Sequence, residues 1–382
     1  VNEYIESHKD IVDASGRRQV VRNGKSQSRK VAFGVGSVEV EAPRVNDRRN
    51  GKKFCSSILP SYLRRSPKIE SLLPILYLRG MSTTKISDTM TEFFDDPSMG
   101  LSPATICKLT KSWQDDFSKW KKQRISKKHV YIWADGVNVK LRLGGDKKIC
   151  LLVIMGVNEN GKKELLAVQE GYRESKESWL VVLRSLIDRG FTAPLVASGD
   201  GALGFWSALS ELEELQETKP QRCWVHKIAN VLDKLPKRVQ PEVKSLLHEM
   251  MNAPDRESAE KSKDKMVRIY NDKYPKAIEC LTKDWTQLTT FFDFPAAHWR
   301  NIRSTNAIES SFATVKLRTK TTKGAGSAKM AAALAFKLLQ ECEKKWIRLR
   351  KAEEITNLLN GVEYKDGVIY DKNLNGQEVA SM

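Results

Sequence analysis

The feature that most constrains the fold is a change of pattern near residue 130. Three strand-like runs, VYIWADGVNV, KICLLVIMGV and ELLAVQEGY, follow one another there, and Asn160-Gly161 offers a hairpin turn between the last two. A helical pattern over 175–190, a buried-type strand APLVASGDG and a second helix over 203–215 come next. Three strands in a meander followed by a helix–strand alternation predict an α/β protein whose mixed sheet is flanked by helices.

Two aspartates lie where a carboxylate is costly to bury. Asp135 interrupts a core-type strand, and Asp200 ends the fourth strand, just before a helix. A buried carboxylate must be paired, hydrogen-bonded or bound to a metal, although an Asp-Gly turn or a helix cap would also explain either residue. The strand order resembles the ribonuclease H-like fold, a mixed five-stranded sheet in which the first and fourth strands lie side by side. That fold would bring the two carboxylates together.

A third carboxylate is expected from a later helix that crosses the sheet. In STNAIESSFATVK (304–316), Ile308, Phe312 and Val315 form an apolar stripe, and Glu309 shares the adjacent stripe with Lys316. The alternative is a solvated glutamate on an amphipathic helix. Asp135, Asp200 and Glu309 together would suit two Mg²⁺ or Mn²⁺ ions, which prefer oxygen ligands and can clamp a phosphoryl displacement.

The charge points to a polyanion. The net charge is +18, and the excess of lysine and arginine is greatest in the first 128 residues. Residues 1–60 predict a loosely ordered basic arm and a β-hairpin across the Gly-x-Gly step at 34–36. Residues 61–128 predict helix, turn, short helix, turn and longer helix, a helix-turn-helix pattern. Three packed helices with no role in DNA binding are the alternative.

The remaining segments complete the predicted organisation. Residues 129–382 are predicted to form a catalytic domain, interrupted at about 230–300 by an all-helical insertion with prolines as punctuation. VEYKDGVIY near the end predicts a hairpin. The six cysteines form no C-x-x-C pair, which fits a reducing compartment. Without a membrane-length apolar run, we expect a cytoplasmic, nucleoid-associated protein with no membrane partner.

Four motifs carry a resemblance to a known family. ADG (134–136), GDGA (199–202), RCWVHK (222–227) and HWRNIRSTNAIESSFATVK (298–316) resemble the Mutator-like transposases of bacterial insertion sequences. The resemblance implies that Asp135, Asp200 and Glu309 are the catalytic triad and metal ligands. It further implies binding of terminal inverted repeats, cleavage of transposon ends and joining of 3′-hydroxyls to target DNA. The resemblance also implies that a divalent metal takes part and that no covalent protein–DNA intermediate forms.

The same resemblance marks Cys223 and His226 as a family signature near the active site. A zinc site would need four ligands, and no second pair is suitably spaced. The alternatives are a phosphate contact or support of the site by His226, or a packed structural pair. A structure-specific nuclease and a DNA-binding protein without activity are competing functions.

The partners expected are double-stranded DNA, as transposon end and as target, and a second copy of the chain in a homodimer on DNA. DNA contacts are predicted for three groups of residues: the start of the third helix, the basic helix after Glu309, and the RCWVHK and HWRNIR motifs. They are Ser102, Thr105, Lys108 and Lys111, then Lys316, Arg318 and Lys320, then His226, Arg300 and Arg303.

Overall fold

The structure is a computed structural model that divides into two compact units, Val1–Leu109 and Thr110–Met382. It describes the chain except for residues 34–35, 57–58, 60–62, 64–65, 95–102, 142–147, 172, 202, 322–323, 371–377 and 380–382. The predicted turn through Asp95, Pro97 and Gly100 lies outside the described residues. The boundary between the units falls within the third predicted helix, α4 (Pro103–Trp120).

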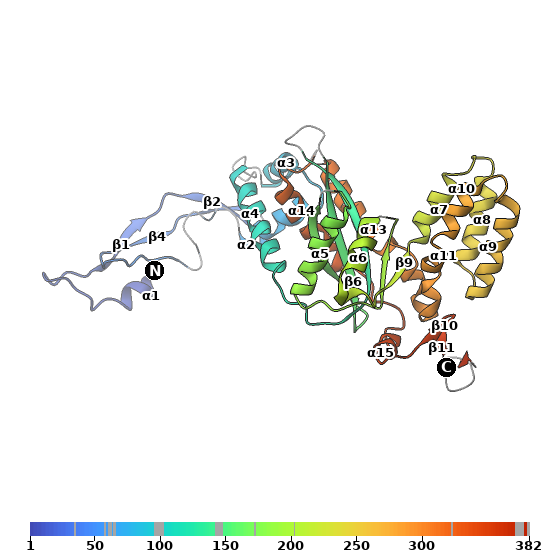
Figure 1. Ribbon diagram of the computed structural model, residues 1–382. Helices are drawn as coiled ribbons and strands as arrows, with labels where there is room; N and C mark the ends of the chain where they lie inside the picture. Colours follow the sequence, from blue (N-terminus) through green and yellow to red (C-terminus); the bar gives the residue numbers. More distant parts are fainter. Residues whose placement is uncertain are drawn as a thin grey trace. The chain divides into compact units, whose positions relative to one another are not determined.

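The first unit begins with two antiparallel strand pairs (Figure 1). β2 (Arg29–Phe33) pairs with β3 (Gly36–Val40), which confirms the hairpin predicted across the Gly-x-Gly step. β1 (Val20–Lys25) pairs with β4 (Pro43–Asp47), a second strand pair that the sequence analysis does not predict.

The N-terminal 30 residues correct the prediction of a loose arm. They contain β1 and a short helix, α1 (Asn2–Glu6). The Tyr4 hydroxyl donates a hydrogen bond to Asp47 (2.8 Å), which also pairs with Arg49 (2.7 Å). The order therefore comes from a partner strand more than 15 residues away and from side-chain pairing, neither of which a local polar pattern reveals.

Three helices follow, in the predicted order of a helix, a short helix and a longer helix. The Ser66 side chain caps α2 (Pro67–Leu78) by accepting from the backbone N–H of Ile69, and Gly80 follows the helix at φ +102°. α3 spans Thr83–Phe94, and α4 ends at Trp120. The order of helices is confirmed, and their use as a helix-turn-helix stays a prediction.

The second unit is built on a five-stranded mixed sheet with the order β7-β6-β5-β8-β9. β5 pairs with β6 and β6 with β7 in antiparallel fashion, whereas β8 and β9 run parallel to β5. The first and fourth strands are therefore neighbours, as predicted. The strands are β5 (His129–Lys140), β6 (Lys148–Asn158), β7 (Lys163–Gly171), β8 (Val196–Gly199) and β9 (Lys219–Arg222).

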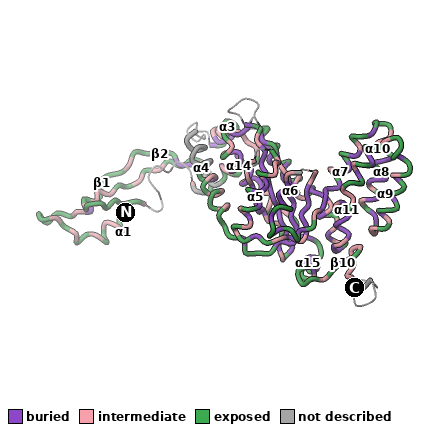
Figure 2. The backbone as a smooth tube through the Cα atoms, viewed as in Figure 1, coloured by how far each residue is buried: buried purple, intermediate pink, exposed green. Residues whose placement is uncertain are grey.

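Helices cover both faces of this sheet (Figures 1 and 2). α5 (Lys176–Asp188) and α6 (Leu203–Glu211) pack on one face, where Trp179, Leu183 and Phe205 join a buried apolar cluster with alternate strand residues. Replacing a fully buried tryptophan such as Trp179 by alanine costs about 3–5 kcal/mol. α13 (Asn306–Thr321) packs against β5, and α14 (Ala328–Glu343) packs against β7.

Between β9 and α13 the chain is helical, as predicted. The prolines act as punctuation, since Pro241 and Pro275 lie in the first turns of two of these helices. The elements are α7 (Trp224–Leu232), α8 (Gln240–Met251), α9 (Arg256–Tyr270), α10 (Pro275–Thr282), α11 (Trp285–Leu288), η3 (Thr290–Asp293), η4 (Ala296–His298) and α12 (Trp299–Ile302).

The C-terminal segment contains the predicted hairpin. After α15 (Glu354–Leu359), β10 (Tyr364–Lys365) pairs with β11 (Val368–Tyr370), and β12 (Glu378–Val379) pairs with β11. The turn residues Asp366 and Gly367 have φ values of 49° and 84°, as the Asp-Gly pattern predicts. Among the described residues, no helix combines the length and apolar character needed to cross a bilayer.

Candidate active site

The register of the sheet places Asp135 beside Asp200. Ala134 on β5 faces Gly199 on β8, so each aspartate comes one residue after the last paired position of two parallel neighbours. Side chains alternate along a strand, and Trp133, on the same face of β5 as Asp135, donates its indole N–H to Asn301 O just before α13. Ser198 likewise donates to Ile302 O. Trp133 and Ser198, each two residues before an aspartate, therefore face the α12–α13 side of the sheet.

A third carboxylate joins them that the sequence analysis missed. Asp135, Glu174 and Asp200 each offer a carboxylate oxygen within 4.8 Å of the other two. Glu174 lies between β7 and α5, directly before Ser175, whose side chain caps α5 by accepting from Ser178 N–H. In the sequence it looks like an ordinary acidic residue ahead of a helix, and only its position after the third strand at the same end of the sheet could have suggested it.

The carboxylates disturb one another's ionisation. Burial, together with the charges of Asp200, Glu174 and Glu309, raises the pKa of Asp135 to about 7, against a hydrogen bond from Gly136 N–H (2.7 Å) that lowers it. Burial and the charge of Asp200 also raise the pKa of Glu174, and the charge of His226 offsets part of this rise. Glu309 makes the smallest of these contributions to the shift at Asp135.

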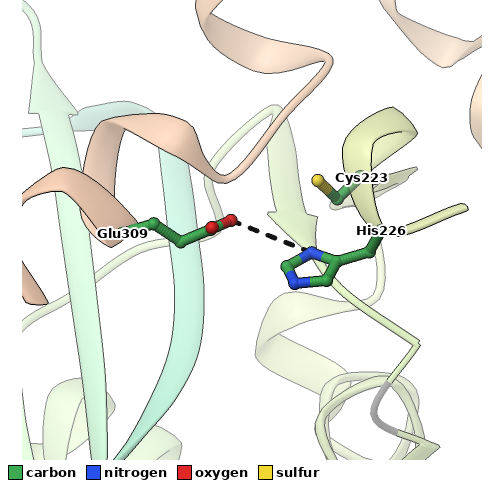
Figure 3. Close-up of side chains that lie close together, drawn as sticks. All are labelled: Cys223, His226 and Glu309. Carbon is green, nitrogen blue, oxygen red and sulfur yellow. Dashed lines mark ion pairs between the residues drawn. The ribbon is translucent and has the colours of Figure 1, made fainter. Parts of the chain in front are cut away.

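Glu309 itself points toward Cys223 and His226 (Figure 3). Its Oε1 lies 3.8 Å from His226 Nδ1, and these two residues form a second potential ligand group with Cys223, whose ligand atoms lie within 4.8 Å of one another. Thr305 links the group, since its hydroxyl contacts Cys223 Sγ (3.2 Å), His226 Nδ1 (3.4 Å) and the Glu309 carboxylate. Glu309 is thus held by side chains from the start of α7 and α13.

The environment favours a charged His226. Its hydrogen bond to Cys223, opposed by burial but aided by the charges of Cys223, Glu309 and Asp200, raises its pKa to about 9. Burial raises the pKa of the Cys223 thiol, but hydrogen bonds from His226 and Thr305 outweigh it, so the pKa lies below its usual value. A cationic His226 therefore stands beside Glu309. Cys223, His226 and Glu309 offer sulfur, nitrogen and oxygen, one ligand fewer than a tetrahedral zinc site needs.

A buried charge network supports the Asp200 backbone. Arg222, at the end of β9, donates to Asp200 O (2.6 Å), and its guanidinium lies 3.2 Å from the Asp284 carboxylate at the start of α11. Lys227 also pairs with Asp284 and donates to Cys280 O (2.8 Å). Two side chains of the RCWVHK motif thereby connect the helical block to the site.

The predicted DNA-contact residues have different surroundings. Lys111, Arg300, Lys316 and Lys320 are exposed, whereas Arg318 is only 1% exposed and lies in the interior. Arg303 donates to Met251 O (2.6 Å) and Asn252 Oδ1 (2.8 Å), and burial lowers its pKa. Ser102 lies outside the described residues, and of Thr105 and Lys108 only the backbone in α4 is described.

Fold and site together define an α/β protein that gathers carboxylates where two parallel strands end. Comparison with known proteins identifies the family, and the chain belongs to it: residues 2–349 match the model for "Transposase, Mutator family". This confirms the resemblance seen in the four motifs.

Curated relatives support the same family. The chain is 46% identical over 284 residues to the transposase for insertion sequence element IST2 of Acidithiobacillus ferrooxidans, a match that covers 74% of this chain and 95% of that protein. It is 41% identical over 305 residues to the transposase for insertion sequence element IS6120 of Mycolicibacterium smegmatis, with 80% of this chain and 93% of that protein covered.

Proposed function

We propose that this chain is the transposase of a bacterial insertion sequence, which binds terminal inverted repeats, cleaves the transposon ends and joins their 3′-hydroxyls to target DNA. Family membership supports the general activity. The observation that carries the proposal to particular residues is the register of β5 and β8, which sets Asp135 beside Asp200. Glu309 is included as the third catalytic residue because of the family resemblance, and its charge contributes to the raised pKa of Asp135.

The donor set suits two hard divalent ions, Mg²⁺ or Mn²⁺. Asp135 and Asp200 offer closely spaced carboxylate oxygens, the ligands these ions prefer, and Glu309 on α13 contributes to the raised pKa of Asp135. Such ions, when bound, polarise the scissile phosphate and favour ionisation of the attacking hydroxyl. Asp135, Asp200 and Glu309 would hold them in a fixed position.

The other side chains of the site have supporting roles in this proposal. Cationic His226 orients the Glu309 carboxylate and adds positive charge near a bound phosphate. The exposed Lys316 and Lys320 lie further along α13 and hold the DNA backbone flanking the cut. Arg318, buried in the same helix, instead supports its packing. The proposed complex is a homodimer on DNA in the cytoplasm, associated with the nucleoid.

The test is a strand-transfer assay with labelled transposon ends and a plasmid target. We expect Asp135→Asn, Asp200→Asn and Glu309→Gln each to abolish cleavage and joining while gel-shift binding of the ends is retained, because each removes a metal ligand and no DNA anchor. Asp188→Asn, an exposed change at the end of α5, serves as the control and should remain active. Ca²⁺ should support binding with little chemistry.

The outcomes separate the competing functions. Cleavage without joining would indicate a nuclease, and binding without either reaction would indicate a DNA-binding protein. Substantial joining by any of the three variants would contradict the proposed mechanism.

A further inference from the structure

We propose that Glu174 is a fourth carboxylate of this site and binds the same cation as Asp135 and Asp200. The proposal rests on the proposed function, since it assigns a further ligand to that metal centre. It arises from the position of Glu174 in the fold and from the glycines that surround it.

The first observation is the spacing of the oxygens. Asp135, Glu174 and Asp200 present oxygens within 4.8 Å of one another, whereas Glu309 groups with Cys223 and His226. An octahedral Mg²⁺ with ligands at about 2.0–2.1 Å separates its ligand oxygens by about 3–4 Å. The first three carboxylates are thus close to the spacing that one ion requires.

The second observation is the space that glycines leave for Glu174. A Cβ at Gly136 would lie 2.4 Å from Glu174 Oε1, so the missing side chain there is what allows this carboxylate to lie against β5 next to Asp135. A Cβ at Gly204 would lie 2.1 Å from the backbone oxygen of Glu174. Gly136, directly after Asp135, and Gly204 in α6 thus accommodate the side chain and the backbone of this one residue.

The backbone ahead of Glu174 is also unusual. Arg173 has φ 58°, in the left-handed region that residues with a Cβ seldom adopt and that costs about 1 kcal/mol or more. The turn it makes directs the chain from β7 into α5 with Glu174 toward the sheet. This conformation and the two glycines act on the same residue, which favours a positioned ligand over a surface carboxylate.

The experiment measures Mn²⁺ binding by the full-length chain, using calorimetry and the electron paramagnetic resonance signal of free Mn²⁺. Glu174→Gln is expected to weaken Mn²⁺ binding at least tenfold, because the amide removes a charged ligand of similar shape, and to reduce strand transfer. Glu174→Asp, which keeps a carboxylate with a shorter reach, should lose less affinity. Glu177→Gln, an exposed acidic residue in the first turn of α5, is the matched control and should bind as the unmodified chain does.

A second variant tests the same contact from the strand. Gly136→Ala should displace the Glu174 carboxylate, the flexible partner in that contact, and weaken Mn²⁺ binding to a similar degree without changing any acidic residue. It also keeps the test valid if Glu174→Gln does not fold, as judged by circular dichroism.

Reference variants separate this inference from the proposed function. If Asp135→Asn and Asp200→Asn lose Mn²⁺ while Glu174→Gln and Gly136→Ala bind it normally, the role of Glu174 is refuted and the proposed site stands. If all four variants bind Mn²⁺ as the unmodified chain does, the proposed metal centre itself is refuted.

Discussion

At neutral pH the Asp135 carboxyl is close to the midpoint of its ionisation, because burial and neighbouring carboxylates raise its pKa to about 7. In the unfolded chain an aspartate ionises near pH 3.8. The folded state therefore holds a proton more tightly than the unfolded state. Above pH 7 both states are ionised and the full electrostatic cost falls on the folded state. Below about pH 3.8 both are protonated and the cost disappears.

The electrostatic cost of ionised Asp135 in the folded state gives a prediction for the metal-free protein. In the presence of a chelator at pH 8, the free energy of unfolding of Asp135→Asn should exceed that of the unmodified chain by about 2–4 kcal/mol. The variant should therefore unfold at a higher denaturant concentration. The difference should shrink as pH falls from 7 toward 4. The asparagine can still accept from Gly136 N–H, so that hydrogen bond is preserved. Asp188→Asn, at an exposed position, should show no such trend; a pH-independent difference at residue 135 would contradict the electrostatic cause.

At the scale of elements, β9 shows how the helical block is attached to the site. Its sequence KPQR lacks an apolar pattern and contains a proline, so local sequence does not predict a strand there. As the edge strand of the sheet it pairs only with β8, a position that tolerates proline. Its last residue, Arg222, then reaches both Asp200 O and Asp284, and Lys227 of α7 reaches Asp284 as well.

We therefore expect Asp284→Asn to destabilise the protein strongly. Arg222 and Lys227 are 8% and 2% exposed, and the change would leave two buried cations without their shared anion, at a cost of about 3–5 kcal/mol. The measurement is equilibrium unfolding in urea. Asp293→Asn breaks the partly exposed ion pair with Arg256 in the same helical block and should cost less than about 1 kcal/mol. Equal effects of the two changes would show that the buried network adds nothing specific.

For the whole molecule, sequence reasoning succeeded where a pattern extends over an element. The core-type run of β5 and the resemblance of the strand order to the ribonuclease H-like fold were enough to predict that Asp135 and Asp200 lie close together. It failed where contacts between distant segments decide the outcome. Glu174 is positioned by the absence of a Cβ at Gly136, Arg318 turned inward on a helix whose neighbouring lysines are exposed, and β1 is ordered by pairing with β4. None of these contacts leaves a periodic signal in the sequence.

The division of labour between α4 and α13 gives the last prediction. Lys108 and Lys111 lie in the first half of α4, and Lys316 lies in α13. If α4 acts as a recognition helix, Lys108→Ala with Lys111→Ala in the full-length chain should weaken binding to the transposon end. The salt dependence of binding should also fall by roughly one unit of slope per lost phosphate contact. Lys119→Ala with Lys122→Ala removes the same charge at and just beyond the other end of α4 and should change binding less.

Lys316→Ala should bind ends nearly normally and join them slowly, because its proposed contact is at the cut. Fluorescence anisotropy over a range of salt concentrations, with specific and unrelated duplexes, measures binding and its salt dependence. The strand-transfer assay measures joining. If the Lys108/Lys111 variant keeps its preference for the transposon end and its salt slope, recognition resides in another part of the chain.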